Sequence, residues 1–141
     1  MIRSARPGDR KSIIGLLTES ELPTRGIADF LDEYAVAEIQ GTVIGVGGIE
    51  YHGRHALLRS LAVSAKHRRR GVATAICDYL EAQATQHEAE HIYILTETAE
   101  EFFAHRGYMS ISRSEAPAEI AASEEFADIC PQSATFMRRP T

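Results

Sequence analysis

Apolar residues follow two different spacings along the chain, and each change of spacing marks a change of element. Residues 2–6 alternate weakly between apolar and polar side chains, which favours a short strand. Residues 7–9, Pro-Gly-Asp, interrupt the alternation, and the apolar positions within 13–17 then recur at helical spacing. Turn-forming residues at 21–26 follow this helix, and residues 27–31 indicate a second, shorter one.

The middle of the chain predicts a hairpin, a further strand and a longer helix. Residues 34–39 and 43–49 alternate on either side of a Gln-Gly-Thr segment, which has the composition of a tight turn. Residues 56–63 form another apolar run, and residues 72–80 return to helical spacing. The basic segment 66–71 therefore lies between a strand and an amphipathic helix.

The same alternation of elements continues beyond the long helix. Residues 92–95 predict a strand, and Thr98 is a candidate N-cap for a helix that carries two phenylalanines. Gly107 ends that helix, and residues 108–111 predict the next strand. The sequence thus has the pattern of a mixed α/β fold.

The last part of the chain adds a helical stretch that begins at Pro117 and a closing strand at residues 134–137. With 141 residues, of which 44% are hydrophobic, the chain can bury one sizeable core, and nothing in its length requires a second. We therefore expect residues 1–141 to form a single domain.

Composition argues against several classes of protein. No apolar run approaches the ~20 residues of a membrane span, and the N-terminus lacks the apolar stretch of a secretory signal, so a cytoplasmic protein is expected. The net charge of -5 argues against a general nucleic-acid binder. Cys77 and Cys130 have no His or Cys neighbours at metal-ligand spacing, which predicts buried thiols and no metal site.

Positive charge is concentrated at one point of the sequence, since four of the fifteen Lys and Arg residues fall within residues 66–70. A helix that begins directly after them offers unpaired backbone amides, Gly71 allows close approach of the backbone, and the arginines add charge-assisted contacts. The segment has neither the Gly-Lys-Ser/Thr of a P-loop nor the first two glycines of a dinucleotide-binding motif. It predicts a site for a diphosphate group.

Two motifs carry a resemblance to a known family. Leu61-Ala62-Val63 followed by Arg68-x-x-Gly71-x-Ala73 resembles the signature of GNAT acetyltransferases, Gln/Arg-x-x-Gly-x-Gly/Ala with its preceding strand. Residues 99–108 are similar to the looser family motif Ala-x-x-Phe-Tyr-x-x-x-Gly-Phe. The resemblance implies a GNAT-type domain, with a mixed, mostly antiparallel twisted sheet flanked by helices. It also implies acetyl-CoA as the cofactor.

The resemblance assigns the cofactor contacts as well. It implies that the main chain of Leu61 and Val63 bonds to the pantetheine arm as an added strand would, while the amides of residues 69–74 hold the pyrophosphate. The implied cofactor-binding residues are Leu61, Ala62, Val63, Arg68, Arg69, Arg70, Gly71, Val72, Ala73, Thr74, Thr96 and Phe103.

Two of these positions depart from the family pattern. Phe103 stands where many members have a tyrosine that protonates the leaving thiolate, so it cannot serve as that acid, and its simpler role is in the core. Thr96 replaces a common asparagine, and its hydroxyl either contacts the cofactor or satisfies the end of a strand. A thiol pKa near ~8.5 makes the thiolate a tolerable leaving group without an acid.

Three charged residues are candidates for the catalytic site. Glu50 and Glu97 lie near strand ends and are possible bases, although an exposed carboxylate explains either position. Arg59 shares a face with Leu57 and Leu61 in an otherwise apolar run, so its charge needs a partner. That partner is either the carboxylate of a substrate or an internal acidic residue.

Finer resemblance extends to the acceptor. Residues 57–63, 95–100 and 129–134 are similar to bacterial arsenic-resistance N-acetyltransferases. This resemblance implies transfer to the primary amine of a small amino-acid-like substrate, such as an arsenic- or phosphorus-containing analogue of glutamate. The segment 115–130 is either a lid over that acceptor or an interface of a homodimer.

Other readings of the same residues stay open. A catalytically weak acetyl-CoA-binding regulatory module would keep the fold and the cofactor, and Phe103 favours it. An acetyltransferase could also act on a protein N-terminus, a lysine side chain or an aminoglycoside. A nucleic-acid binder built on residues 66–70 would need a wider basic face than one loop provides.

Overall fold

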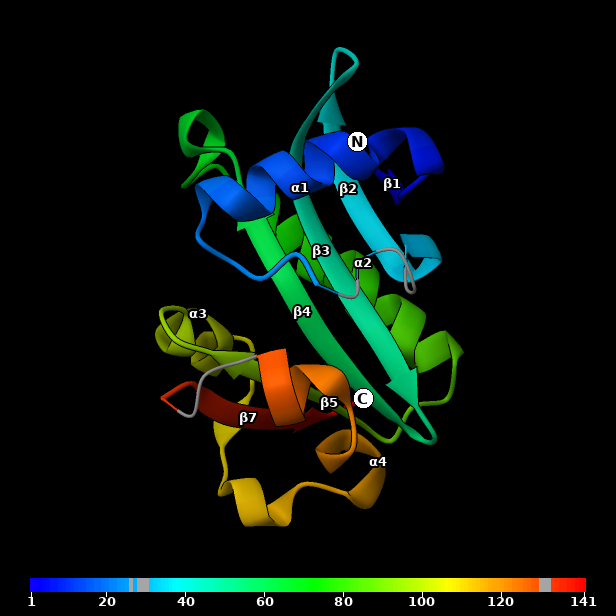
Figure 1. Ribbon diagram of the computed structural model, residues 1–141, viewed down its shortest axis with the longest axis vertical. Helices are drawn as coiled ribbons and strands as arrows, with labels where there is room; N and C mark the ends of the chain where they lie inside the picture. Colours follow the sequence, from blue (N-terminus) through cyan, green and yellow to red (C-terminus); the bar gives the residue numbers. More distant parts are fainter. Residues whose placement is uncertain (26, 28–30, 130–132) are drawn as a thin grey trace.

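The computed structural model describes residues 1–25, 27, 31–129 and 133–141. Seven strands form one sheet in the order β1-β2-β3-β4-β5-β7-β6, and every neighbouring pair is antiparallel except β4 with β5 (Figure 1). The strands are β1 Ile2–Ser4, β2 Tyr34–Ile39, β3 Thr42–His52, β4 His55–Val63, β5 His91–Thr96, β6 Met109–Ser110 and β7 Thr135–Pro140. The α-helices are α1 Arg10–Glu19, α2 Val72–Gln86, α3 Glu100–His105 and α4 Ala118–Ala121. This is the predicted mixed, mostly antiparallel sheet flanked by helices.

The hairpin of β2 and β3 forms where the sequence predicts it. Gln40 and Gly41 both have positive φ, 50° and 80°, which is the backbone of the primed turns that suit the twist of a two-residue hairpin. Glycine adopts this conformation at little cost. The turn therefore fixes the register that aligns Glu38 with Val43, and an irregularity between Ala37 and Glu38 then shifts the pairing by one residue, so that Val36 aligns with Val46.

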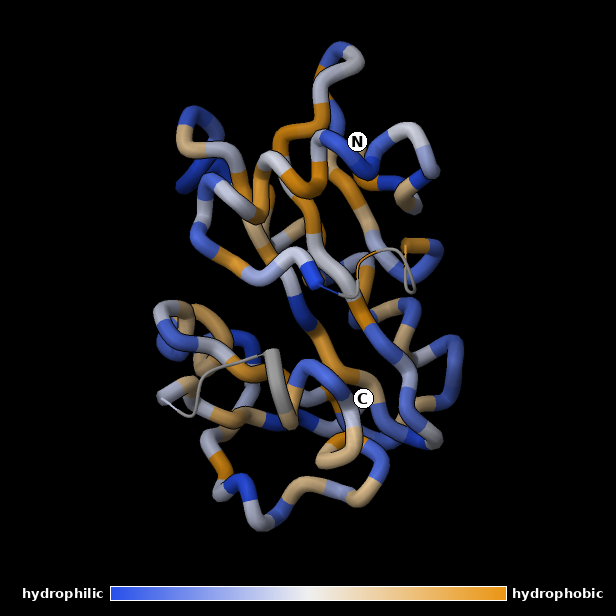
Figure 2. The backbone as a smooth tube through the Cα atoms, viewed as in Figure 1, coloured by the Kyte–Doolittle hydropathy of each residue, from blue (hydrophilic) through white to orange (hydrophobic). Residues whose placement is uncertain are grey.

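Helices cover both faces of the sheet. Residues of α2 and α3 pack with Leu58 and Ile94 on one face, in the cluster that also holds Phe103 and Tyr108. On the other face α1 packs against β2, β3 and Ala62, and α4 packs with Leu57 and the residues of β5 and β7. In Figure 1, α1 and α4 lie in front of the sheet and α2 lies behind it, and in Figure 2 the strands carry most of the hydrophobic segments.

The sheet opens between β4 and β5. These parallel strands pair only from His55 to Leu58 on β4 and from His91 to Ile94 on β5. Beyond this point β4 pairs with β3 alone among the described strands, and β5 continues beside β7. The two strands thus diverge in the middle of the molecule, as Figure 1 shows.

A β-bulge at Ser60 changes the side-chain alternation of β4. Gly48 aligns with Arg59 and Val46 with Ala62, so β4 has one residue more than β3 in this stretch, and Ser60 takes a φ of 60°. The prediction that Arg59 and Leu61 share a face is therefore wrong. Leu61 packs with the α2 cluster, whereas Arg59 keeps the face of Leu57.

Other local differences have equally local causes. The N-cap of α3 is Ala99 and not Thr98, and the hydroxyl of Thr96 accepts a hydrogen bond from the Ala99 amide at 3.0 Å. The strand predicted at 108–111 is only β6, Met109–Ser110, at the sheet edge. Of the helix predicted at 27–31, most lies outside the described residues, and Leu31–Glu33 forms a 3₁₀ turn.

The prediction of buried thiols can be compared with the structure at only one of the two cysteines. Cys77 is a buried free thiol on α2, as predicted, and burial raises its pKa to about 12. Cys130 lies outside the described residues. Within the described part of the chain, no helix is long and apolar enough to cross a membrane.

Candidate active site

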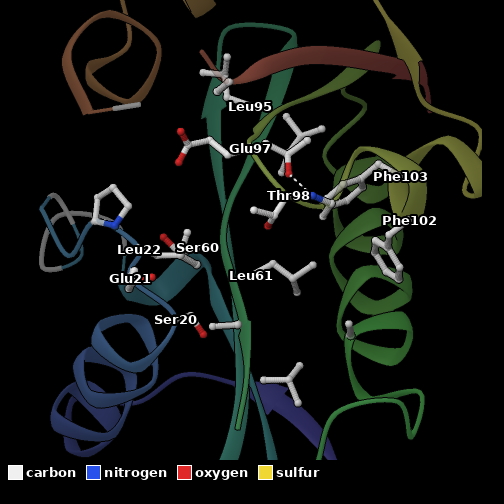
Figure 3. A pocket seen from close by; sticks show the side chains of 18 of the residues that line it. Ser20, Glu21, Leu22, Ser60, Leu61, Leu95, Glu97, Thr98, Phe102 and Phe103 are labelled. Carbon is white, nitrogen blue, oxygen red and sulfur yellow. Dashed lines mark hydrogen bonds between the residues drawn. The ribbon is translucent and has the colours of Figure 1, made fainter. Parts of the chain in front are cut away.

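A cleft of about 580 Å³ lies where β4 and β5 diverge. One wall comes from β4 and the start of α2, and the other from the end of β5 and α3, while the loop after α1 closes one side (Figure 3). Its lining includes eight of the predicted site residues: Leu61, Ala62, Val63, Arg68, Ala73, Thr96, Glu97 and Phe103.

Beyond Leu58, the edge of β4 that faces this cleft pairs with no other strand among the described residues. Ala62 and Val63 pair with Val46 and Gly45 of β3 on their other edge, and β5 pairs only as far as Leu58. The carbonyl of Val63 accepts a hydrogen bond from Arg68 Nε at 3.0 Å. An extended ligand can therefore add along this edge as a strand would, as predicted for the pantetheine arm.

The basic loop leads into α2 with the backbone that the prediction required. Gly71 is the N-cap of α2 and has a φ of 79°, in the left-handed region that glycine favours. Arg69 also has a positive φ, 64°. The amides of the first turn, from Val72 to Thr74, have no partner within the helix, and amides in this position are the groups that bind anions at helix N-termini.

The arginines of the loop divide between two environments. Arg68 lines the cleft, where its guanidinium also lies 3.4 Å from the Ser20 hydroxyl. Arg69 and Arg70 are exposed beside Gly71. Five of the predicted cofactor contacts do not line the cleft, namely Arg69, Arg70, Gly71, Val72 and Thr74. They lie at the N-terminus of α2, where a diphosphate outside the cleft would lie.

The aromatic side chains of α3 belong to both the core and the cleft. Phe103 is 2% exposed, and its ring packs edge-on against those of Phe102 and Tyr108 at 5.1 and 5.2 Å between centroids. It therefore has the core role that the sequence favoured. The hydroxyl of Thr96 satisfies the Ala99 amide, which is one of the two roles predicted for it.

Arg59 lies at the centre of a buried ionic network behind the cleft. Its Nη1 donates to Glu50 Oε2 at 2.7 Å, its Nη2 donates to the Arg25 carbonyl at 2.7 Å, and its Nε donates to the Ser60 hydroxyl at 3.1 Å. Glu125 Oε1 lies 3.6 Å from Nη2. The internal partner that the sequence left open is thus present, and Arg59 itself does not line the cleft.

Glu50 is the most closely held carboxylate of this network. It is 2% exposed, and its second oxygen lies 2.7 Å from His52 Nε2. Burial raises the pKa of Glu50, but the hydrogen bonds of His52 and Arg59 outweigh burial and leave that pKa below its usual value. Glu50 does not line the cleft, whereas Glu97 does and accepts a hydrogen bond from Ser133 at 3.0 Å.

Sequence reasoning missed several residues of the cleft. The loop from Glu19 to Pro23, Ser60, Phe102 and Glu125 all line it. No sequence pattern indicates that Ser60 lines the cleft, because the bulge at this residue depends on the pairing of β4 with β3. The loop after α1 did have such a pattern, since its turn composition is typical of segments that border sites. Glu125 falls within the segment 115–130, for which a lid was one of two predictions.

No group of three or more His, Cys, Asp or Glu residues in the described chain is placed to hold a metal ion.

A family model and several known proteins are similar to this chain in sequence or in fold. Residues 12–108 match the family model described as the acetyltransferase (GNAT) family. An uncharacterized N-acetyltransferase of Chlorobaculum tepidum is 27% identical over an alignment of 127 residues, which covers 84% of this chain and 81% of the relative. Rv2747 of Mycobacterium tuberculosis, solved with CoA and NLQ, matches with a TM-score of 0.86 and 23% identity over 100% of this chain and 99% of its own.

The N-acetylglutamate synthase of Neisseria gonorrhoeae, solved with coenzyme A and N-acetyl-glutamate, matches with a TM-score of 0.87 and 21% identity. The match covers 99% of this chain and 34% of the synthase, so the chain spans about a third of that protein. The family model covers more than half of the chain, and the main-chain edge of β4 and the N-terminus of α2 lie where its motifs predicted them. The chain therefore belongs to the acetyltransferase (GNAT) family and is an acetyl-CoA-dependent N-acetyltransferase.

Proposed function

We propose that the protein transfers the acetyl group of acetyl-CoA to the primary amine of a small amino-acid-like acceptor. The observation that carries this proposal is the division of the cleft into two sides. The edge of β4 and the start of α2 suit the cofactor, and the loop from Glu19 to Pro23 closes the opposite side together with Glu125 and Ala134. A volume of about 580 Å³ is typical of small-molecule sites.

One structural neighbour and a sequence resemblance support an amino-acid acceptor. The synthase of Neisseria gonorrhoeae was solved with N-acetyl-glutamate, the product of acetyl transfer to an amino acid. The sequence resemblance to arsenic-resistance N-acetyltransferases adds a more specific candidate, an arsenic- or phosphorus-containing analogue of glutamate. A cleft of about 580 Å³ also fits such acceptors better than a protein surface.

The reaction requires few groups from the protein. The neutral amine attacks the thioester carbonyl carbon, the C–N bond forms as the C–S bond breaks, and coenzyme A leaves as a thiolate that takes up a proton. We assign the removal of the amine proton to Glu97, because it lies in the cleft, while Glu50 is enclosed behind it. The buried Phe103 leaves the thiolate to be protonated by solvent.

A thiol-release assay tests the proposal. Purified protein is mixed with acetyl-CoA and a panel of amino acids, including glutamate, its phosphorus analogue, glutamine and lysine, and the free thiol of coenzyme A is measured together with the acetylated product. We expect release that depends on one class of amino acid. Release with a peptide N-terminus or an aminoglycoside alone would contradict the acceptor assignment.

Phe103 also favours one second candidate, a regulatory module that binds acetyl-CoA with little turnover, because no tyrosine hydroxyl is present at that position. Calorimetry separates the two candidates. A module would bind acetyl-CoA tightly and release no thiol with any amine of the panel, whereas the enzyme would do both. The homodimer, through residues 115–130, stays a prediction that analytical ultracentrifugation tests.

A further inference from the structure

Ser60 lies where the free edge of β4 begins, and its side chain is among those that line the cleft (Figure 3). The strand pairs with β5 only as far as Leu58, and Ser60 belongs to the β-bulge that follows. Its φ of 60° lies in the left-handed region, which residues other than glycine rarely adopt. Strained backbone that the surrounding structure holds in place is concentrated at functional sites.

The hydroxyl of Ser60 accepts one hydrogen bond from inside the protein, from Arg59 Nε at 3.1 Å. The Tyr34 hydroxyl also lies 3.1 Å away, and the geometry allows either oxygen to be the donor. Tyr34 is 1% exposed, and among the described residues its hydroxyl bonds to Ser60 alone. If Ser60 donated this bond, the phenol proton would be buried without an acceptor, which is costly. Tyr34 is therefore the donor.

This direction leaves the proton of Ser60 for a group in the cleft. A serine hydroxyl has one proton and two lone pairs, and Arg59 and Tyr34 donate to both lone pairs. The described part of the chain offers the proton no acceptor, and the side chain faces the cleft. Because the Arg59 guanidinium donates to the same oxygen, it polarises the hydroxyl and makes it a stronger donor.

The expected path of the cofactor brings its thioester to this hydroxyl. The diphosphate is expected at the N-terminus of α2, beyond the end of β4, and the pantetheine arm along the free edge of the strand. An arm that starts at α2 passes Val63 first and Leu61 second, and its thioester end then reaches Ser60. It extends no further along the strand, because β5 occupies the edge at Leu58.

We infer that the Ser60 hydroxyl is a catalytic donor to the carbonyl oxygen of the thioester. When the amine nitrogen attacks the carbonyl carbon, the π electron pair of the C=O bond moves to the oxygen, and this oxyanion accepts the hydrogen bond of Ser60. The C=O bond re-forms as the C–S bond breaks, and Ser60 keeps its proton throughout. Tyr34 and Arg59 are positioning residues that orient the hydroxyl. A donor oriented before the reaction stabilises the oxyanion more than the ground state.

Ser60→Gly and Ser60→Ala test the inference, because each removes the hydroxyl. Glycine adopts a φ of 60° without strain, so Ser60→Gly keeps the backbone of the bulge. With any amine that supports thiol release, we expect both variants to lower kcat by about 10²-fold and to change the KM for acetyl-CoA little, since the hydrogen bond strengthens as the oxyanion forms. A kcat equal to that of the wild type in both variants would overturn the inference.

Tyr34→Phe is the matched control for the hydrogen-bond network. It removes the same bond between Tyr34 and Ser60 that Ser60→Gly removes, but it leaves the Ser60 hydroxyl in the cleft with its bond to Arg59. We expect its loss of kcat to be about tenfold smaller than the loss in Ser60→Gly. Equal losses would assign the effect to the network and not to donation by Ser60.

Infrared spectroscopy tests the hydrogen bond without turnover. Acetyl-CoA that is isotope-labelled at its thioester carbonyl is bound to each protein, and the C=O stretching band is recorded. A hydrogen bond to the carbonyl oxygen weakens the C=O bond, so the band should lie at lower frequency in the wild type and in Tyr34→Phe than in Ser60→Gly. The same frequency in the wild type and in Ser60→Gly would contradict the inference.

The inference rests on the cofactor side of the proposed function, and it holds for any acceptor amine. If the amino acids fail and another amine supports thiol release, the acceptor assignment fails, and the Ser60 variants are compared with that amine. If no amine supports release, the infrared comparison decides the role of Ser60. Absence of acetyl-CoA binding from the wild type would remove the cofactor from β4 and would overturn this inference with it.

Discussion

Arg59 carries a full charge into the interior of the protein, where its side chain is 1% exposed. Each of its three nitrogens has an acceptor from the protein, namely Glu50, the Arg25 carbonyl and the Ser60 hydroxyl. The residue joins β3, β4 and the loop after α1 through these bonds. A guanidinium suits this position because its planar fork offers donors in several directions at once.

Replacement of Arg59 by alanine should therefore destabilise the fold strongly. It leaves Glu50 and Glu125 buried without their shared cation, and the removal of one partner of a buried ion pair costs about 3–5 kcal/mol. Urea denaturation of the variant and the wild type measures the difference. Arg59→Lys keeps the charge and should lose less. A change below ~1 kcal/mol for Arg59→Ala would show that water enters and replaces the side chain.

At the scale of elements, the start of α2 and the middle of α1 offer two glycines with opposite requirements. Gly71 has a φ of 79° and caps the helix that is expected to hold the pyrophosphate. Gly15 lies inside α1 on its exposed side, where an added Cβ would meet no atom within 4 Å. An alanine has room at both positions, so only the backbone conformation differs.

Gly71→Ala should lower the free energy of unfolding by about 1 kcal/mol, because alanine is strained in the left-handed region. Gly15→Ala should raise it by about 0.5–1 kcal/mol, because alanine is the better residue within a helix. Calorimetry should also find weaker acetyl-CoA binding for Gly71→Ala and unchanged binding for Gly15→Ala. Equal affinity of both variants would remove the loop from the cofactor site.

At the scale of the whole molecule, the stability of the sheet depends on pH at the paired end of β4 and β5. His55 and His91 lie in register there, with ring centroids 6.2 Å apart, near Tyr93, Glu90 and Arg138. Burial lowers the pKa of His91, and the positive charges of Arg138 and His55 lower it further, although Glu90 opposes them. The folded protein therefore favours the neutral imidazole more than the unfolded chain does.

The sign of the pH dependence follows from this shift. Since the folded pKa lies below the unfolded value of 6.5, the contribution of His91 is fully present above pH 6.5 and is lost as the pH falls through the folded pKa. The thermal midpoint should therefore decrease as the pH is lowered from about 7.5 to about 5. His91→Gln should show a smaller decrease over the same range, and an equal decrease would assign the effect to other groups.

Much of the fold was accessible from the sequence because local chemistry determines it. The Gln40-Gly41 turn, the helix that ends two residues before Gly107 and the basic segment before α2 each depend on residues that are adjacent in the chain. The cofactor side of the site was predicted for the same reason, since Leu61 to Ala73 form one continuous strand, loop and helix. Its edge and its helix N-terminus are main-chain features, which sequence patterns predict well.

The acceptor side depended on contacts that sequence spacing does not encode. Only pairing with β3 creates the bulge at Ser60, which separates Arg59 from the face of Leu61. Only the packing of the π-helix against the diverging strands brings Glu125 to Arg59, 66 positions earlier in the chain, and to the cleft. The sequence by itself determined most of the elements and the family motifs, and it predicted the cofactor side. Tertiary structure alone decided which charges meet at the acceptor side, because burial and distance between remote residues exist only in the folded chain.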